Sequence, residues 1–181
     1  DDGLQNIALV RDFEIAVVDG ARGWGLNALL PAGPLREPRS RLKQVNAIVC
    51  NGQPLDKLPA HIPHYLMQLQ THAFYALSNP EQTAHAADFM GKKLAAVAGI
   101  GHPQRFFNTL SALGLQFSQH PYPDHHVFSD ADIPSHADII IMTEKDAVKC
   151  RHLNHAKIWV LPVEAQLPEA LLTQVIQHLH R

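Results

Sequence analysis

Two segments decide the fold class: LAAVAGIGHPQRFFNTLSALG at residues 94–114 and DIIIMTEKDAVK at residues 138–149. Each begins with an apolar run, at 94–98 and 138–142, that has the length of a buried strand. Each run ends in a polar cluster that opens a helical pattern, and Pro103 and Gly114 bracket the first helix. Thr143 and Asp146 have the spacing of a capping box at the start of the second. This alternation predicts an α/β protein with polar residues at the carboxyl ends of its strands.

The composition limits the classes of partner. The chain has 181 residues, 46% of them hydrophobic, with 15 Lys and Arg against 17 Asp and Glu. This balance, a formal net charge of -2, argues against a nucleic-acid partner. The two cysteines, Cys50 and Cys150, form no CxxC pair, which favours a reduced, cytosolic compartment. No apolar run approaches the ~18 residues of a spanning helix.

The remaining segments predict three regions. Residues 1–55 carry strands at 14–18 and 46–50, joined by a long Gly- and Pro-rich loop, and we expect a remnant of a parallel-sheet core. Residues 56–90 are predicted to form a linker with a possible two-stranded hairpin at 65–70 and 72–77, and a helical alternative is open for these two segments. Residues 91–181 are expected to form a small α/β domain with a strand at 157–163 and a terminal helix at 168–179. The residues predicted to face inward from that helix are Leu171, Leu172, Val175, Ile176 and Leu179.

The chain opens with the acidic pair Asp1-Asp2, followed by Gly3. Such a pair usually ends a buried strand, and that strand would precede residue 1, so we expect the chain to be the C-terminal part of a longer protein. The carboxylates could hold Mg²⁺, or they could be a solvated terminus. Arg36 and Glu37 lie in the long loop, where a guanidinium could clamp a phosphate or form a surface ion pair.

The sharpest chemical signal is Asp124-His125-His126. A carboxylate beside an imidazole can orient it and raise its basicity, which suits a general base or a metal ligand. Because the chain has 13 histidines, chance adjacency explains the pattern about as well as a functional role does. The turn at residues 99–103 could cradle an anion at a helix N-terminus or serve tight packing. The sequence contains no G-x-x-x-x-G-K-[ST] motif and therefore no phosphate-binding P-loop.

Taken in order, the strings DDGLQ, EIAVVDG, LLPAGPLREPRSRL, VAGIGHPQRFF, PDHHVFSDAD and IIIMTEKDAVKC resemble the C-terminal portion of the tetraacyldisaccharide 4'-kinase family. The resemblance covers nearly the whole chain. It implies the C-terminal part of a P-loop kinase: the remnant of the parallel-sheet core, a smaller α/β domain and a short two-stranded linker. Asn6 and Leu26-Asn27 depart from the residues that the family usually has there.

The same resemblance implies the reaction. The family transfers the γ-phosphate of ATP to the 4'-hydroxyl of a tetraacylated glucosamine disaccharide 1-phosphate, the lipid A precursor, with Mg²⁺. It works as a peripheral protein at the cytoplasmic face of the inner membrane of Gram-negative bacteria, and the region that associates with the membrane precedes this chain.

Residue by residue, the resemblance makes Asp1 and Asp2 the Mg²⁺ ligands and His125 the partner of a catalytic aspartate upstream of this chain. It makes Gln5, Arg36 and Glu37 residues that face the nucleotide and the substrate. Without the P-loop, the chain alone is expected to be inactive.

Two other functions are compatible with parts of the sequence. Asp-His-His is also the signature of a family of metal-dependent phosphoesterases, which would need further Asp ligands at strand ends, for example Asp19. The chain could also be an inert half that folds and only binds.

Overall fold

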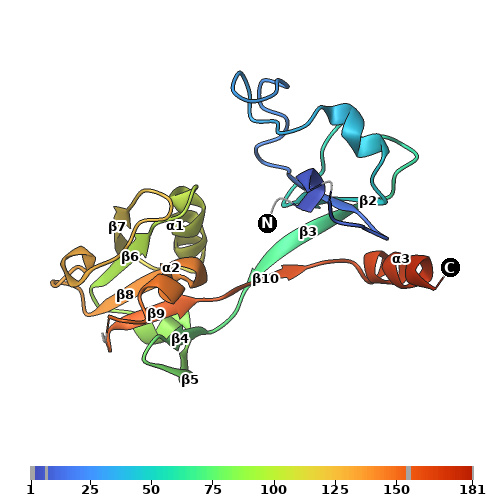
Figure 1. Ribbon diagram of the computed structural model, residues 1–181. Helices are drawn as coiled ribbons and strands as arrows, with labels where there is room; N and C mark the ends of the chain where they lie inside the picture. The colour runs from blue at the N-terminus through green and yellow to red at the C-terminus, as the bar shows by residue number, and fades with distance from the viewer. Residues whose placement is uncertain (1–2, 7, 154–155, 181) are drawn as a thin grey trace. The chain divides into compact units, whose positions relative to one another are not determined.

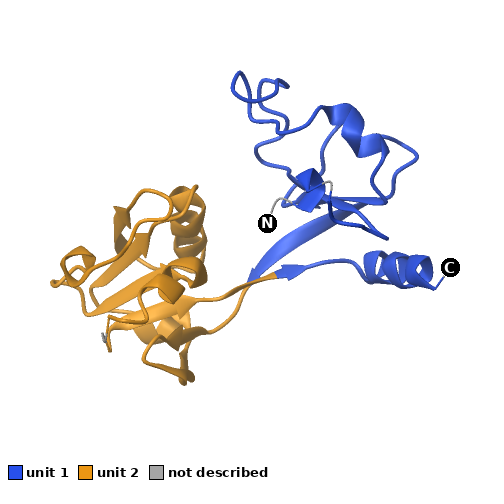
Figure 2. Ribbon diagram, in the orientation of Figure 1, with its two compact units in different colours: residues 1–70, 165–181 blue, residues 71–164 orange. Residues whose placement is uncertain are grey.

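The computed structural model describes residues 3–6, 8–153 and 156–180, and the chain divides into two compact units (Figures 1 and 2). Unit 1 comprises residues 1–70 and 165–181, and unit 2 comprises residues 71–164. Unit 2 is therefore continuous in sequence, whereas unit 1 is assembled from the two ends of the chain. Each unit combines a largely parallel sheet with helices, which is the α/β class that the sequence predicted.

Unit 2 is built on a six-stranded sheet with the order β5-β4-β9-β8-β6-β7. The strands β6, β7, β8 and β9 are parallel to one another, and β4 joins the edge of β9 in antiparallel pairing with β9 and β5. The central strands are buried on both faces, as their continuous apolar sequences require. Their bounds are β4 Phe74–Ala76, β5 Asn79–Ala84, β6 Leu94–Ala98, β7 Phe117–Pro121, β8 Ile139–Thr143 and β9 Ile158–Leu161.

The two helices of unit 2 cover opposite faces of this sheet. Along β6, Ala96 and Ala98 belong to the apolar cluster that contains the buried residues of α1 (Pro103–Ala112). Ala95 and Val97 belong to the cluster that contains Ala147 of α2 (Glu144–Lys149). Successive strand residues point to opposite faces, so a short run of small apolar residues serves both cores. As predicted, α1 begins at Pro103, although its N-cap residue His102 makes no side-chain capping hydrogen bond. Thr143 caps α2, and its hydroxyl accepts from the Asp146 N–H at 3.2 Å.

Unit 1 has a four-stranded sheet with the order β1-β2-β3-β10. Its strands are β1 Ile15–Asp19, β2 Ala47–Asn51, β3 His64–Thr71 and β10 Val163–Gln166, and β1, β2 and β3 are parallel. The terminal helix α3 (Glu169–Leu179) packs on one face through Leu171 and Val175. Loop residues, among them Leu4 and Leu42, cover the other face. Short 3-10 turns complete the chain at Gly3–Gln5, Arg39–Lys43, Ala86–Phe89 and Asp130–Asp132.

The units divide the chain differently from the predicted boundaries at 55/56 and 90/91. The terminal helix belongs to unit 1, because Tyr65 of β3 donates its hydroxyl to Gln174 Oε1 at 2.7 Å and Gln174 donates to the Asn46 carbonyl at 3.0 Å. Only Leu171 of its five predicted inward residues is buried; Val175 is partly buried, and Leu172, Ile176 and Leu179 are exposed.

The predicted hairpin between residues 65–70 and 72–77 is also wrong. The first segment lies in β3, which pairs with β2 and neighbours β10, whereas the second contains β4, which pairs with β5 and β9. The two strands that connect the units are thus β3 and β10. The predicted strand at 157–163 is divided as well, because Pro162 separates β9 from β10.

Candidate functional site

A buried carboxylate organises the carboxyl ends of β6 and β8 in unit 2. Asp146 is completely buried, and its Oδ2 accepts from the Gly99 N–H at 3.0 Å and from the Thr143 hydroxyl at 2.8 Å. Its Oδ1 accepts from Lys149 Nζ at 3.0 Å, and Lys149 also donates to the Gly99 carbonyl at 3.3 Å. This network ties the loop after β6 to the first turn of α2. Asp146 is therefore a structural residue, satisfied by neighbours from the loop after β6, from the end of β8 and from α2.

The same network decides the role of the turn at residues 99–103. A Cβ added to Gly99 would lie 3.1 Å from the Phe128 ring and 3.3 Å from Asp146 Oδ1, so the glycine permits a close approach. Because its N–H is already bonded to Asp146, it has no amide proton left for an anion. At Gly99 the geometry favours tight packing, the second of the two interpretations that the sequence allowed.

Asp124 and Lys145 form an ion pair beside His125. Lys145 Nζ lies 2.8 Å from Asp124 Oδ1, which also accepts from the His125 N–H at 3.0 Å. The other carboxylate oxygen lies 3.7 Å from His125 Nε2. The hydrogen bond from Lys145 holds the pKa of Asp124 below its ordinary value. A negative charge is thereby kept close to the imidazole.

His125 is presented to solvent by an unusual backbone. Its side chain is 79% exposed, and its φ of 62° lies in the left-handed region, which a non-glycine residue rarely adopts. Strained backbone of this kind clusters at functional sites, where it fixes the direction of a side chain. An exposed imidazole beside a carboxylate can take a proton from a hydroxyl group that approaches it.

His126, the next residue, has a packing role. Its ring stacks on Tyr122 with centroids 4.5 Å apart and meets Phe128 edge-on at 4.9 Å. Its Nε2 is buried and lies 3.4 Å from Asp132 Oδ2, without hydrogen-bond geometry. The structure thus separates the two histidines: His125 is available for chemistry, and His126 joins an aromatic cluster.

In unit 1, the residues predicted to face the nucleotide and the substrate come together. Gln5, Arg36 and Glu37 line one pocket of about 160 Å³. Gln5 Nε2 donates to Glu37 Oε1 at 2.6 Å, and Arg41 Nε lies 3.4 Å from Glu37 Oε2. Arg41 is in turn bound by both oxygens of Glu14 at 2.9 Å. Glu37 is therefore held from both sides at the wall of this pocket.

The predicted metal ligands Asp1 and Asp2 lie outside the described residues. Within 3–6, 8–153 and 156–180, no group of three or more His, Cys, Asp or Glu side chains could hold a metal ion. Asp19 accepts from the Ala21 and Arg22 N–H groups, both at 3.1 Å. The metal cluster that the phosphoesterase alternative requires is thus not found in the described part of the chain.

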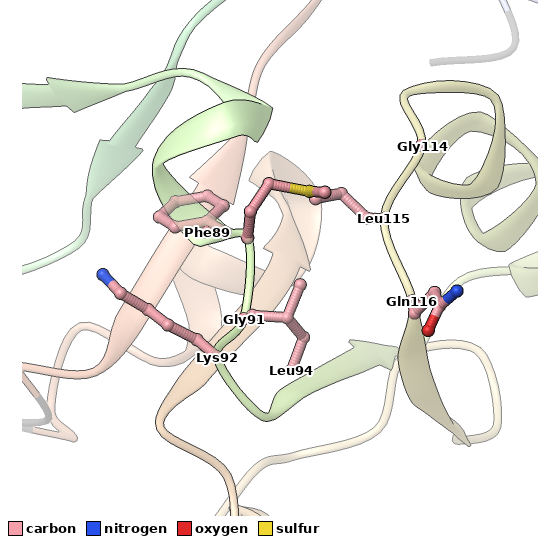
Figure 3. Close-up of a pocket in the computed structure, with 8 residues that line it drawn as sticks. Phe89, Gly91, Lys92, Leu94, Gly114, Leu115 and Gln116 are labelled. Carbon is pink, nitrogen blue, oxygen red and sulfur yellow. The ribbon is translucent and has the colours of Figure 1, made fainter.

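A larger pocket of about 300 Å³ lies at the other end of the unit 2 sheet (Figure 3). Phe89, Lys92 and Leu94 line one side, and Leu115 and Gln116 line the other. It lies beside the beginning of β6, whereas ligands in open α/β sheets bind at the carboxyl ends of the strands. Its described lining contains no histidine or carboxylate. We therefore place the candidate site of unit 2 at Asp124, His125 and Lys145.

The family model for tetraacyldisaccharide-1-P 4'-kinase (LpxK) matches residues 1–180. The chain belongs to this family. The tetraacyldisaccharide 4'-kinase of Chromobacterium violaceum is 48% identical over 186 residues, which cover 99% of this chain and 55% of the relative. That of Dechloromonas aromatica is 47% identical over 181 residues, covering 99% of this chain and 54% of the relative. The chain spans about half the length of the curated relatives it matches.

A solved LpxK of Aquifex aeolicus, crystallised in complex with ATP, has the same fold as this member of the LpxK family. It superposes with a TM-score of 0.77 at 25% identity and covers 98% of this chain and 56% of that one. The expected identity as the C-terminal part of a P-loop kinase is consistent with this match. No described helix of the chain is long and apolar enough to span a bilayer.

One residue of each unit's candidate site was missed in the sequence. Lys145 was not singled out in the sequence, and it pairs with Asp124, 21 positions away. Trp24 lines the pocket of Gln5, Arg36 and Glu37 and was not singled out. The only local signal for Trp24 is its place between two glycines in a long loop.

Proposed function

We propose that the protein containing this chain transfers the γ-phosphate of ATP to the 4'-hydroxyl of a tetraacylated glucosamine disaccharide 1-phosphate. Membership of a family of kinases and the likeness to a relative crystallised with ATP support this proposal. Phosphoryl transfer requires positioning, neutralisation of charge and a group that takes the hydroxyl proton. This chain offers candidates for each of these tasks.

The observation that carries the proposal is the presentation of His125. Its imidazole is exposed in a left-handed backbone conformation, and the carboxylate of Asp124 lies 3.7 Å away. We assign to His125 the acceptance of the proton from the 4'-hydroxyl, in partnership with an aspartate outside this chain. The Asp124 carboxylate favours the imidazolium that results, because opposite charges at this distance attract.

Gln5, Arg36 and Glu37 are proposed to face the nucleotide and the substrate. Arg36 brings a guanidinium, which can contact two phosphate oxygens at once. We assign Mg²⁺ to Asp1 and Asp2, because hard cations prefer carboxylate oxygens, and the ion would neutralise phosphate charge. The substrate carries four acyl chains, so we place the protein at a membrane surface, specifically as a peripheral protein at the cytoplasmic face of the inner membrane.

The chain of residues 1–181 is not expected to phosphorylate this substrate by itself, because its sequence has no P-loop to hold the β- and γ-phosphates. An assay with radiolabelled ATP and the disaccharide 1-phosphate tests this expectation. ATP-dependent formation of the 4'-phosphate by this chain alone would contradict the mechanism.

The test of the proposal is His125→Ala in the longer protein, with His126→Ala as the matched control. We expect His125→Ala to lower kcat and kcat/KM together by about 10²–10⁴-fold, since a proton acceptor acts mainly in the transition state. His126→Ala should have a mild effect on kcat. Thermal melts of both variants separate loss of chemistry from loss of folding. A near-normal kcat for a folded His125→Ala protein, or a larger loss of kcat in His126→Ala, would refute the assignment.

A further inference from the structure

The carboxylate of Asp124 is bound by two donors through one of its oxygens. Its Oδ1 accepts from Lys145 Nζ at 2.8 Å and from the His125 N–H at 3.0 Å. Its Oδ2 lies 3.7 Å from His125 Nε2, and a Cβ on Gly101 would lie 3.6 Å from this second oxygen. Because two donors share Oδ1, they restrict the rotation of the carboxylate and keep Oδ2 beside the imidazole.

Lys145 reaches Asp124 from a firmly bonded part of unit 2. It is the second residue of α2 and follows directly on the turn that Thr143 caps. The next residue, Asp146, is completely buried and accepts from the N–H of Gly99 in the loop after β6. The backbone at Lys145 is therefore well fixed, and its side chain links this turn to a loop 21 positions earlier in the chain.

The backbone of His125 requires support from its neighbours. A non-glycine residue with a φ of 62° costs free energy and persists only where surrounding groups hold it. The His125 N–H is bound by the Asp124 carboxylate, and that carboxylate is bound by Lys145. The hydrogen bond from Lys145 also lowers the pKa of Asp124 and so keeps this acceptor ionised. Because an exposed ion pair adds little to overall stability, we expect Lys145 to affect the orientation of His125 instead.

We propose that Lys145 is a positioning residue for His125: it holds the Asp124 carboxylate in the orientation that presents the imidazole to the substrate hydroxyl. This inference deepens the proposed function and rests on it for the identity of the proton that His125 accepts. Lys145 acts through Asp124 and needs no contact with the substrate. Its loss should therefore slow the chemical step and leave substrate binding nearly unchanged.

Kinetics of the longer protein test the inference with Lys145→Met, which keeps an unbranched side chain and removes its charge. We expect kcat to fall about tenfold, less than for His125→Ala, because a misplaced proton acceptor still retains part of its effect. The KM values should stay nearly unchanged. Lys92→Met is the matched control, since it removes a lysine beside the beginning of β6, at the opposite end of the sheet, and it should change neither constant.

A double-mutant cycle separates positioning from direct contact with the substrate. If Lys145 acts through Asp124, adding Lys145→Met to Asp124→Ala should cause little further loss of kcat. Additive losses would mean that Lys145 contacts the substrate by itself. An unchanged kcat for Lys145→Met would mean that it has no part in the reaction, and either result overturns the inference. Thermal melts of the same variants show that the losses do not come from unfolding.

NMR relaxation of the chain of residues 1–181 gives a measurement that does not depend on kinase activity. The backbone order parameter of His125 should fall in Lys145→Met from about 0.85, the value of rigid backbone, toward about 0.6, and Lys92→Met should not change it. An unchanged order parameter in Lys145→Met overturns the inference.

The two measurements separate this inference from the proposed function. If the longer protein is inactive as a kinase while the order parameter of His125 falls in Lys145→Met, the proposed function fails and the positioning of His125 by Lys145 stands. If His125→Ala lowers kcat as expected while Lys145→Met changes neither kcat nor the order parameter, the inference alone fails.

Discussion

The two units differ in how completely they bury their apolar side chains. Unit 2 encloses two apolar clusters, one on each face of its sheet, with Phe74, Phe89 and Phe107 among the most buried side chains. Unit 1 has smaller clusters around β2. Many of its larger apolar side chains are exposed, including Leu9, Val10, Val17, Leu26, Leu30, Leu172, Ile176 and Leu179. Exposed apolar series of this kind are typical of surfaces that pack against other polypeptide.

This contrast predicts that unit 2 folds alone and that unit 1 does not. Residues 71–164, produced as a separate protein, should show a cooperative thermal transition, because a complete core gives two-state unfolding. Near-UV circular dichroism, which reports on the buried Trp159, measures it. The matched protein is unit 1 alone, in which an Asn-Gly dipeptide joins residue 70 to residue 165. It should melt without a sharp transition. A broad melt of unit 2, or a sharp one of unit 1, would reverse the comparison.

The next largest effect is expected from the buried carboxylate of unit 2. Asp146→Ala removes a fully buried group that bonds Gly99, Thr143 and Lys149, so the free energy of unfolding should fall by about 3 kcal/mol or more. Lys145→Ala is the control, because it breaks only a solvent-exposed ion pair, which contributes little to the free energy of unfolding. Urea unfolding of chains carrying Trp24→Phe, followed by Trp159 emission, compares the two. Equal losses would show that the Asp146 network is not what stabilises the unit.

The central elements of unit 2, namely β6, β8, α1 and α2, could be predicted from the sequence because local rules specify them. The run at 94–98 is apolar throughout and became β6, and Pro103 and Thr143 marked the starts of α1 and α2. The unit to which α3 belongs could not be predicted, because an apolar stripe on a helix does not show which of two sheets the helix will cover. The pairing of Asp124 with Lys145 could not be predicted either, because these two residues are far apart in the sequence and only the fold brings them together. The difference between His125 and His126 depends on Tyr122 and Phe128, whose contacts only the fold creates.

A smaller effect should separate the two histidines in stability. His126→Ala removes ring contacts with Tyr122 and Phe128 and should lower the free energy of unfolding by about 1–2 kcal/mol. His125→Ala should stay within about 0.5 kcal/mol, as expected of an exposed side chain. His125→Gly should be neutral or stabilising, because glycine adopts positive φ freely. Urea unfolding of the three variants measures the order, and a more destabilising His125→Ala would contradict it.

The smallest effect concerns protonation at the exposed edge of unit 2. Since the hydrogen bond from Lys145 lowers the pKa of Asp124, Lys145→Ala should raise this pKa toward its ordinary value. Because the pKa of Asp124 is lower in the folded state than in the unfolded state, the ionised carboxylate stabilises the fold at pH values above the unfolded pKa. This contribution to the free energy of unfolding is lost as the pH falls through the folded pKa. Carboxyl ¹³C titration by NMR measures the pKa. An unchanged value in Lys145→Ala would mean that another group sets it.

The connection through β3 and β10 has a consequence for the order in which the chain folds during synthesis. The chain leaves unit 1 after residue 70 and returns to it at residue 165, so all of unit 2 is made before the last segment of unit 1. Domains generally fold as units while the ribosome is still at work. Unit 2 can therefore be complete while β2 and β3 still wait for Leu171 and Gln174 of α3. In the interval, the apolar face of β2 that α3 later covers is open to solvent, and this nascent chain is the stage at which unit 1 is most exposed to misassociation.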